Sequence, residues 1–426
     1  MQNIIDLLQE RGFIDAMTSE EIRVCAENPM RVYLGFDPTA DSLHVGNLMG
    51  IVALAWFQKC GHTPVVLLGG ATGRIGDPSG KSVERPLLEE FAIQSNLLAI
   101  RKNFDSILDF SHPTAAPIFL NNGDWFKGYD LIDFLRDIGK HFRMGTMLAK
   151  ESVRSRIESE EGMSFTEFSY QMIQAYDFYY LSQEYGVQLQ LGGSDQWGNI
   201  TAGTELIRKK GGKAAYGLTF PLLTRSDGKK FGKSEEGAVW LAPEKLSPYQ
   251  FYQYFIRIPD ADVIKLMRLL TFMELAQINE QELAMLHPTY IPNTAQKLLA
   301  EELTRMVHGE EGLRVAQRVT EGAAPGSKTV LDVEALREIQ HDMPYVALSK
   351  DEIIGQKFVD LAVKIGFAAS KGELVRLIQN GGAYLNNEKI EDAALRLEVS
   401  SLIGGEYLLF ALGKKKKMLI KMIILD

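Results

Sequence analysis

Two stretches of the chain combine residue types that can stabilise phosphate. In the first, His44, Gly46 and Asn47 stand between a short apolar segment, 31–36, and an apolar helical pattern. The first turn of a helix offers unpaired N–H groups and the positive end of the helix dipole, which favour an anion. His44 and Asn47 could add two donors, so the chemistry indicated is stabilisation of phosphate charge without a nucleophile. A turn with a hydrogen-bonded histidine is the alternative.

The second stretch, 224–234, reads TRSDGKKFGKS and is called the lysine loop below. Its glycines and cations suit neither a helix nor a strand. Lys230 and Lys233 are compact charges on long stems, which could close over a polyphosphate and then withdraw. A surface turn is the alternative. The apolar residues 220–223 have the character of a buried strand end, which would direct the loop toward the ligand edge of a sheet.

A third group could line a polar pocket. The pattern of 165–184 predicts a helix with Tyr170, Gln174 and Asp177 on one face, at i, i+4 and i+7. Asp177 and the phenol of Tyr33 could bond a buried hydroxyl, while Tyr170 and Gln174 could hold an ammonium group. The alternative is an aromatic helix packed in the core, with Asp177 at its surface.

Two glycine-rich segments have weaker signals. Gly193 ends a strand-like segment and would let a ribose approach the backbone, with Asp195 and Gln196 as polar partners. The segment 76–82, GDPSGKS, resembles a P-loop, but it has three residues between its glycines where that motif needs four. Pro78 also lacks the N–H that a phosphate nest uses, so a P-loop ATPase is excluded.

A sheet must bring these groups together. Short apolar strands separated by helices are typical of a mostly parallel α/β sheet, whose ligands bind beyond the carboxyl ends of the strands. Strands are predicted at 31–36, 64–68, 117–120 and 186–191, and helices at 48–59, 84–104 and 165–184. Past 240 the pattern predicts helices at 248–258 and 295–307. A flexible segment at 320–328 and a compact tail at 350–426 follow.

Composition narrows the class of protein. The net charge of −9 argues against a chain coated in nucleic acid, although basic patches at 140–156 and 414–421 could contact RNA or form solvated faces. No apolar run is long enough to span a membrane, and the N-terminus lacks a signal-peptide pattern. Cys25 and Cys60 have no metal-ligand spacing, so we predict no metal site and a reducing cytoplasm.

Together these segments resemble the bacterial-type tyrosyl-tRNA synthetases, which are class I aminoacyl-tRNA synthetases. The HIGH signature corresponds to His44-Val45-Gly46-Asn47, and KMSKS corresponds to Lys230-Phe231-Gly232-Lys233-Ser234. The stretches YLGFDPTADSLHVGN, GDPSGKS, YQMIQAYDF and QLGGSDQWGNITAG match in order and spacing, over essentially the whole chain. Asn47 stands where the signature has its last histidine. The asparagine side chain keeps a hydrogen-bond donor but has no cationic form.

The resemblance implies a role for each matching residue. It implies that the phenolic hydroxyl of tyrosine is read by Tyr33 and Asp177, and that its amino group is bound by Tyr170 and Gln174. The same site would be lined by Asp77, Gln190 and Gln196. Contacts to the amino acid or the nucleotide are implied for Gly35, Asp37, Asn47, Gly193, Asp195, Gln196 and Lys233. The γ-phosphate would face Thr39 and His44, and pyrophosphate would be drawn away by Lys81, Arg85, Lys230 and Lys233.

The resemblance also implies a domain order. We expect a Rossmann-like parallel-sheet catalytic domain at 1–225, the lysine loop with an α-helical domain at 226–320, a linker at 321–349 and an α+β RNA-binding domain at 350–426. The last resembles the module of ribosomal protein S-four, which contacts phosphates and shape more than base sequence. Its RNA-facing candidates are Lys371, Arg376, Asn380 and Lys389.

The implied activity is activation of L-tyrosine with ATP and Mg²⁺, then transfer to tRNA(Tyr), with no tightly bound cofactor. The implied state is a cytoplasmic homodimer without membrane association. Tryptophanyl-tRNA synthetases share the fold, but the Tyr33/Asp177 pair and the tail favour tyrosine. A non-catalytic RNA-binding protein that kept the synthetase shell is the second alternative, and His44, Lys230 and Lys233 argue against it.

Overall fold

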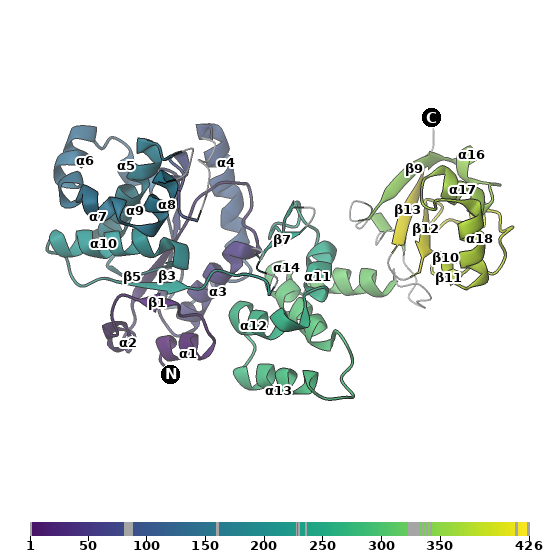
Figure 1. The fold of residues 1–426 in the computed structure, drawn as a ribbon, viewed down its shortest axis with the longest axis horizontal. Helices are drawn as coiled ribbons and strands as arrows, with labels where there is room; N and C mark the ends of the chain where they lie inside the picture. Colours follow the sequence, from purple (N-terminus) through teal and green to yellow (C-terminus); the bar gives the residue numbers. More distant parts are fainter. Residues whose placement is uncertain are drawn as a thin grey trace. The chain divides into compact units, whose positions relative to one another are not determined.

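The structure is a computed structural model that describes residues 2–80, 88–158, 162–226, 228, 231–234, 237–322, 332–333, 336–337, 340, 343–413 and 416–423. Two compact units make up the chain (Figure 1). Unit 1 comprises Met1–Lys245 and Phe255–Val307, and unit 2 comprises Leu246–Tyr254 and His308–Asp426.

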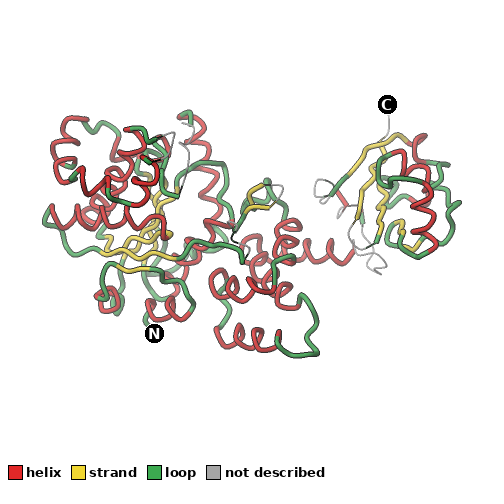
Figure 2. Tube along the Cα trace, viewed as in Figure 1, coloured by secondary structure: helices red, strands yellow, loops and turns green. Residues whose placement is uncertain are grey.

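Unit 1 is built on a six-stranded sheet of order β1-β6-β5-β2-β3-β4, drawn in yellow among red helices in Figure 2. All neighbouring strands are parallel except β1, which runs antiparallel to β6. The strands are β1 Ala16–Met17, β2 Arg31–Phe36, β3 Thr63–Leu68, β4 Ile118–Asn121, β5 Val187–Gly193 and β6 Tyr216–Phe220. The mostly parallel sheet predicted from the apolar strands is therefore confirmed.

Helices cover both faces of this sheet. Successive residues of a strand point to opposite faces. Tyr33 packs on Phe178 of α9, with ring centroids 5.2 Å apart, whereas Leu34 contacts Gly50 of α3. The helices of unit 1 up to the last strand are α1 Ile4–Glu10, α2 Glu21–Cys25, α3 Val45–Lys59, α4 Glu90–Arg101, α5 Gly123–Phe126, α6 Leu131–Asp137, α7 Met144–Leu148, α8 Glu151–Ile157, α9 Phe165–Glu184 and α10 Trp197–Lys209.

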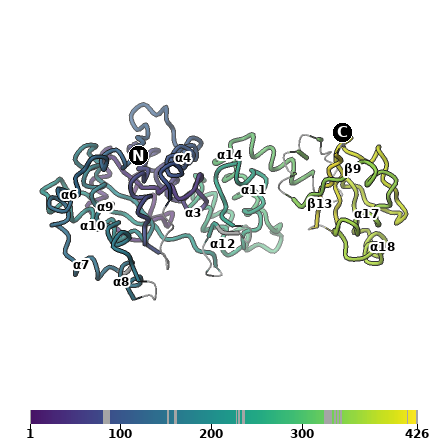
Figure 3. Tube along the Cα trace, turned by 90° about the horizontal axis from the view of Figure 1, so that it is seen from above, coloured from purple at the N-terminus to yellow at the C-terminus, as the bar shows by residue number. Residues whose placement is uncertain are grey.

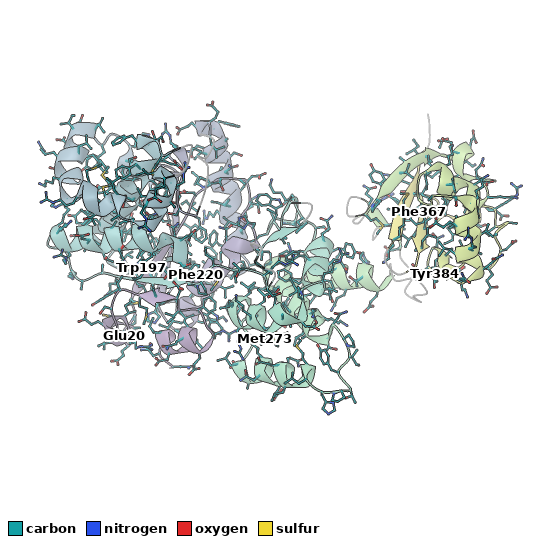
Figure 4. All side chains as sticks on the ribbon, in the orientation of Figure 1. Glu20, Trp197, Phe220, Met273, Phe367 and Tyr384 are labelled. Atoms are coloured by element: carbon teal, nitrogen blue, oxygen red, sulfur yellow. The ribbon has the colours of Figure 1, made fainter. Side chains whose placement is uncertain are left out.

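Element bounds agree best where apolar periodicity is strong. β2 and α9 have the predicted bounds. The predicted helix at 84–104 is wrong at its start, since the described residues 88–89 are extended and α4 begins at Glu90. The prediction of a buried strand end at 220–223 is wrong beyond Phe220, because β6 ends there and Leu222 is 46% exposed. Phe220 is labelled in Figure 4.

Helices follow the sheet in sequence. They are α11 Pro248–Ile256, α12 Asp260–Leu270, α13 Leu275–Met285 and α14 Thr294–Gly322, preceded by a short hairpin of β7 Lys233–Ser234 and β8 Gly237–Ala238. Within α14, Gly309 has φ 73° and ψ 179°, which is not helical. A residue other than glycine would be strained at that position.

Unit 2 holds a five-stranded sheet of order β11-β10-β12-β13-β9. Its elements are β9 Tyr345–Ser349, α16 Lys350–Ile353, α17 Phe358–Lys364, α18 Lys371–Gln379, β10 Ala383–Leu385, β11 Glu388–Lys389, β12 Tyr407–Leu412 and β13 Lys416–Ile423. Figures 1 and 3 both place α17 and α18 together beside this sheet. The α+β character predicted for the tail is confirmed.

Both faces of the unit 2 sheet are covered, because β12 alternates. Leu408 and Phe410 join the core under α17 and α18, while Tyr407 and Leu409 pack with Val319 of α14. β9 lies inside the range predicted as a linker, and most of the segment 320–328 is outside the described residues. The four domain ranges stay a prediction.

A buried arginine joins α12 to the first helix of unit 1. Arg11 is 2% exposed, and its guanidinium donates to the carbonyls of Arg268, Thr271 and Met273 at 2.7–2.9 Å. It also lies 4.7 Å from the ring centroid of Trp56 in α3. These carbonyls lie at the end of α12, where helical partners are missing, so Arg11 closes that end.

Arg11→Ala should lower the free energy of unfolding by about 2–4 kcal/mol, because several buried carbonyls lose their donor at once. Urea denaturation followed by circular dichroism measures the change. Arg23→Ala is the matched control: Arg23 is half-buried and paired with Asp6 and Glu20 at the surface, and its loss should cost less than about 1 kcal/mol. Equal losses for the two variants would contradict this account of Arg11.

Candidate active site

A cavity of about 350 Å³ opens at the carboxyl ends of β2 and β5. From β2 the chain goes to β3 on one side, while β5 pairs with β2 on the other, so this is the switch point of the sheet. The predicted residues that line it are Tyr33, Gly35, Asp37, Thr39, His44, Asn47, Asp77, Tyr170, Gln174, Asp177, Gln190, Gly193, Asp195 and Gln196. The structure therefore brings together residues separated by more than 150 positions.

His44 caps α3 at one end of the cavity. Its Nδ1 accepts from the N–H of Gly46 at 3.0 Å, and the Asn47 side-chain oxygen accepts from the His44 N–H at 3.1 Å. Because Nδ1 is an acceptor, the neutral ring carries its proton on Nε2. The early start of α3, at Val45, follows from this capping box, and the Asn47 oxygen is used inside the helix turn.

The opposite end of the cavity holds a buried carboxylate. Asp177 is 1% exposed, so the alternative of a surface position is wrong. Its oxygens accept from Trp125 Nε1 at 2.8 Å and from Asn122 Nδ2 at 3.0 Å. Burial raises the pKa of Asp177 to about 8, while the two N–H donors act in the opposite direction.

A phenol without a partner lies beside this carboxylate. The Tyr33 hydroxyl is buried and has no hydrogen-bond partner among the described residues, and the same holds for the side-chain oxygen of Gln190. Burial and the neighbouring Asp177 raise the pKa of Tyr33 well above its ordinary value, so the phenol keeps its proton. Buried polar groups are nearly always paired, so these two atoms are suited to meet a polar ligand.

A chain of hydrogen bonds links the buried Asp177 to the half-buried Asp37. Asp37 accepts from the Tyr170 hydroxyl at 2.9 Å and from the Thr72 hydroxyl at 2.7 Å. Thr72 in turn accepts from Asn122 at 3.0 Å, and Asn122 also donates to Asp177. Burial and Asp37 raise the pKa of Tyr170 well above its ordinary value, which keeps this phenol a donor.

A third carboxylate lies in an amide cluster. Asp77 accepts from Gln196 at 2.7 Å, and the Asn199 amide donates to Gln174 at 3.0 Å and to Gln196 at 3.2 Å. Asp77, Tyr170 and Gln174 thus present a carboxylate, a phenol and an amide to the middle of the cavity. These are partners for an ammonium group.

Ser79 and Trp240 also line the cavity. Sequence reasoning missed both of them, together with Thr72, Asn122, Trp125 and Asn199. Asn122 and Trp125 follow the predicted strand 117–120 directly, at the ligand edge of the sheet, and that position could have identified them. Lys81, Arg85 and Lys230 lie outside the described residues. Lys233 begins β7, and the structure does not describe its side chain.

The RNA candidates lie in unit 2. Lys371 begins α18, which Ser370 caps by accepting from the Glu373 N–H, and Lys371 pairs with Asp360 at 2.7 Å. Arg376 lies in the same helix and Asn380 ends it. Lys389 lies in β11 and packs over Gly381, whose φ is +67°. The four candidates thus lie on one helix, at its end, and on the hairpin that follows it.

Comparison with known proteins identifies the class. Residues 26–323 match the family model described as "tRNA synthetases class I (W and Y)", and residues 335–420 match a "Tyrosine--tRNA ligase SYY-like C-terminal domain". The fold is that of a class I tRNA synthetase.

The relatives place the chain within that class. It is 59% identical to a tyrosine–tRNA ligase of Protochlamydia amoebophila over 99% of both chains. It is 50% identical to the chloroplastic and mitochondrial tyrosine–tRNA ligase of Arabidopsis thaliana, over 98% of this chain and 83% of that one. The chain belongs to the tyrosine–tRNA ligase family.

A solved structure agrees with this. A C-terminally truncated mitochondrial tyrosyl-tRNA synthetase of Aspergillus nidulans is 31% identical, with a TM-score of 0.65 over 74% of this chain and 92% of that one. In the part of the chain that the structure describes, no helix has the length and apolarity needed to cross a membrane.

Trp125→Phe should weaken tyrosine binding about tenfold or more at pH 7, because the ionised form of Asp177 loses a buried N–H donor. The pKa of Asp177 should rise further above 8, so the deficit should shrink as the pH rises from 7 to 9. Equilibrium dialysis with labelled tyrosine measures both effects. Trp56→Phe is the control, since Trp56 does not line the cavity. A deficit that is equal at pH 7 and pH 9 would contradict the proposed cause.

Proposed function

We propose that the cavity activates L-tyrosine with MgATP and that the product is transferred to tRNA(Tyr). The observation that carries this proposal is the buried Tyr33 hydroxyl, which has no partner among the described residues and lies beside the buried carboxylate of Asp177. A tyrosine ligand would place its phenol between them, donating to Asp177 and accepting from Tyr33. A tryptophan ring has an N–H donor but no acceptor, so it would leave the Tyr33 hydroxyl without a partner.

The amino group of tyrosine would lie at Tyr170, Gln174 and Asp77. These side chains are already hydrogen-bonded to neighbours, which holds them in place before the ligand arrives. Such preorganisation supports binding, since less freedom is lost when the ammonium group enters. The carboxylate of tyrosine then faces the end of the cavity where α3 begins.

ATP would bind at that end, with its phosphates at Thr39, His44 and the first turn of α3. The neutral imidazole donates from Nε2, and the helix dipole favours the negative charge. Lys81, Arg85, Lys230 and Lys233 would add cations around the pyrophosphate. Mg²⁺ enters as part of the MgATP substrate, held mainly by phosphate oxygens.

The chemistry follows from this placement. The tyrosine carboxylate attacks the α-phosphorus of ATP in line, forming tyrosyl-adenylate and releasing pyrophosphate. A ribose hydroxyl of the terminal tRNA adenosine then attacks the carbonyl carbon, which forms the ester and releases AMP. Neither step needs a covalent enzyme intermediate, so positioning and charge stabilisation supply the catalysis.

We further propose that unit 2 binds the tRNA through the surface of α18 and the β10–β11 hairpin. Lys371, Arg376, Asn380 and Lys389 supply donors there. Such contacts would bind phosphates of the tRNA backbone, and the tRNA would be recognised by its shape. A reducing cytoplasm suits this activity and the two free cysteines.

Tyr33→Phe should lower selection of tyrosine over phenylalanine by about tenfold, because the phenol of the substrate loses one buried partner. Pyrophosphate exchange with tyrosine, phenylalanine and tryptophan measures this as a ratio of kcat/KM values. Tyr176→Phe is the matched control, since Tyr176 lies in α9 and does not line the cavity.

Wild-type exchange that depends on tyrosine alone supports the proposal. Exchange with tryptophan, or RNA binding without any exchange, would refute it. Unchanged selectivity in the Tyr33→Phe protein would show that Tyr33 does not recognise the phenol of the substrate.

A homodimer is supported by apolar surface on α6. Leu131 is 68% exposed and Ile132 is 67% exposed, on a helix of seven residues that also exposes Leu135. Nearby in sequence, Met144 and Phe165 are exposed as well. Large exposed apolar groups of this kind are typical of an interface, and a second copy of the chain is the occupant we propose.

Ile132→Asp should convert the dimer to a monomer, because the interface would bury an unpaired charge. Sedimentation velocity measures the change in mass. Leu283→Asp is the control: Leu283 is 69% exposed on α13, and its substitution should leave the dimer intact. A wild-type protein that sediments as a monomer would contradict the assignment.

A further inference from the structure

A buried carboxylate of α12 binds the start of the lysine loop. Asp262 lies in the first turn of α12 and is 5% exposed. Its oxygens accept from the backbone N–H of Ser226 at 2.9 and 3.2 Å, and from the Ser226 hydroxyl at 3.1 Å. Hydrogen bonds to a buried, ionised group are among the stronger ones in proteins. Ser226 itself is exposed, so its position depends on this contact.

Asp262 stands on a helix that is itself held in place. Arg11 closes the far end of α12 by donating to its last carbonyls, and its guanidinium lies over Trp56 of α3. The helices α12 and α3 pack together, and α3 begins at the His44 cap. The carboxylate of Asp262 is therefore at a fixed distance from the start of α3.

The other end of the lysine loop is joined to α3 by backbone contacts. Val239 donates to the carbonyl of Gly232 at 2.9 Å, and Val45 donates to the carbonyl of Val239 at 2.8 Å. At Gly232, φ is +85°, and an added Cβ would lie 3.1 Å from the Gly46 nitrogen. This end thus depends on glycine and on main-chain pairing. At the start of the loop, the Phe231 N–H donates to the Leu223 carbonyl at 3.1 Å, and Asp262 adds the side-chain contact that holds Ser226.

We propose that Asp262 is a positioning residue for adenylate formation, acting through Ser226 on the lysine loop. The inference rests on the proposed function, since it assigns the loop lysines to the phosphates of ATP. Asp262 touches no substrate in this scheme. Asp262 instead holds Ser226, which precedes the loop lysines in the sequence.

The physical reason is the sensitivity of charge stabilisation to distance. A segment that is held at more points loses less conformational freedom when its charges are ordered around a ligand, so less of that cost falls on the chemical step. Tyrosine binding does not use this loop in the scheme above. Loss of the anchor should therefore slow the chemical step and leave tyrosine affinity intact.

Asp262→Asn tests the proposal, with Asp260→Asn as the matched control. Both acids lie in the first turn of α12, so both substitutions remove the same favourable charge from the helix dipole. Asp260 accepts from Gln296 and makes no hydrogen bond to the described residues of the loop. Ser226→Ala is the second variant: it keeps the backbone bond, removes the hydroxyl bond, and leaves an exposed position that tolerates alanine.

Three measurements are made on the full chain. Hydrogen exchange of the peptide that contains Ser226 reports the anchor itself, with or without activity. Single-turnover formation of tyrosyl-adenylate reports the chemical step, and equilibrium dialysis reports the tyrosine Kd.

Asp262→Asn should expose the Ser226 amide and slow adenylate formation by about 10- to 100-fold relative to Asp260→Asn. The tyrosine Kd should change by less than about twofold, which separates positioning from binding. Ser226→Ala should slow the step by about threefold, and the double variant should lose less than the product of the two, since both remove the same contact.

Retained protection at Ser226 in Asp262→Asn would overturn the anchor. Lost protection with an adenylate rate equal to that of Asp260→Asn would overturn its role in the reaction. If Asp262→Asn does not fold, an unprotected Ser226 amide in the wild-type chain would overturn the anchor, and a wild-type adenylate rate in Ser226→Ala would overturn its role in the reaction. Failure of the wild-type chain to exchange pyrophosphate with tyrosine would refute the proposed function, while the hydrogen-exchange result still decides whether the anchor exists.

Discussion

The catalytic unit depends on how it keeps two carboxylates, Asp37 and Asp177, inside one cavity. A buried carboxylate is costly unless donors are aimed at it. Here the donors come from separate parts of the chain: Tyr170 from α9, Asn122 after β4, and Thr72 after β3. Because each donor belongs to a different element, the network exists only when the sheet and its helices are assembled.

The network also decides what the cavity can accept. At the Asp177 end, Asn122 and Trp125 already donate to the carboxylate, whereas the Tyr33 hydroxyl has no partner among the described residues, so a ligand hydroxyl could donate to Asp177 and accept from Tyr33. At the other end, the cap of α3 offers N–H groups and a positive dipole, which suit a polyphosphate. The amino acid and the nucleotide are thereby given opposite ends of one cavity, with their reacting groups between.

In unit 2, both faces of a small sheet carry apolar side chains that must be buried. Its β12 strand alternates, so Phe410 packs under α17 and α18, while Tyr407 and Leu409 use the last turns of α14. Asn387, in the β10–β11 turn, also donates to the carbonyl of Gly322 at the end of α14. Within unit 2, the candidate RNA surface is thus joined to the helix that precedes it, which limits how freely that surface can turn.

The sequence by itself determined the parallel sheet and the bounds of β2 and α9, and it indicated polar residues after β2 and β5 but not Thr72 after β3 or Asn122 and Trp125 after β4. Strong apolar periodicity and ordered signatures are local properties, so they can be recognised in the sequence without the structure. The sequence did not determine that Asn122 and Trp125 would meet Asp177, or that Asn47 would turn its oxygen back into the helix cap.

The two contacts with Asp177 join residues some fifty positions apart, and their partners are chosen by the packing of β3, β4 and α9. The same applies to Asp262, a first-turn helix acid whose neighbour in space, Ser226, lies in another segment. Burial decides which polar atoms need a hydrogen-bond partner within the protein. Only the tertiary structure shows which polar atoms lose water, and those atoms must then find their partners within the fold.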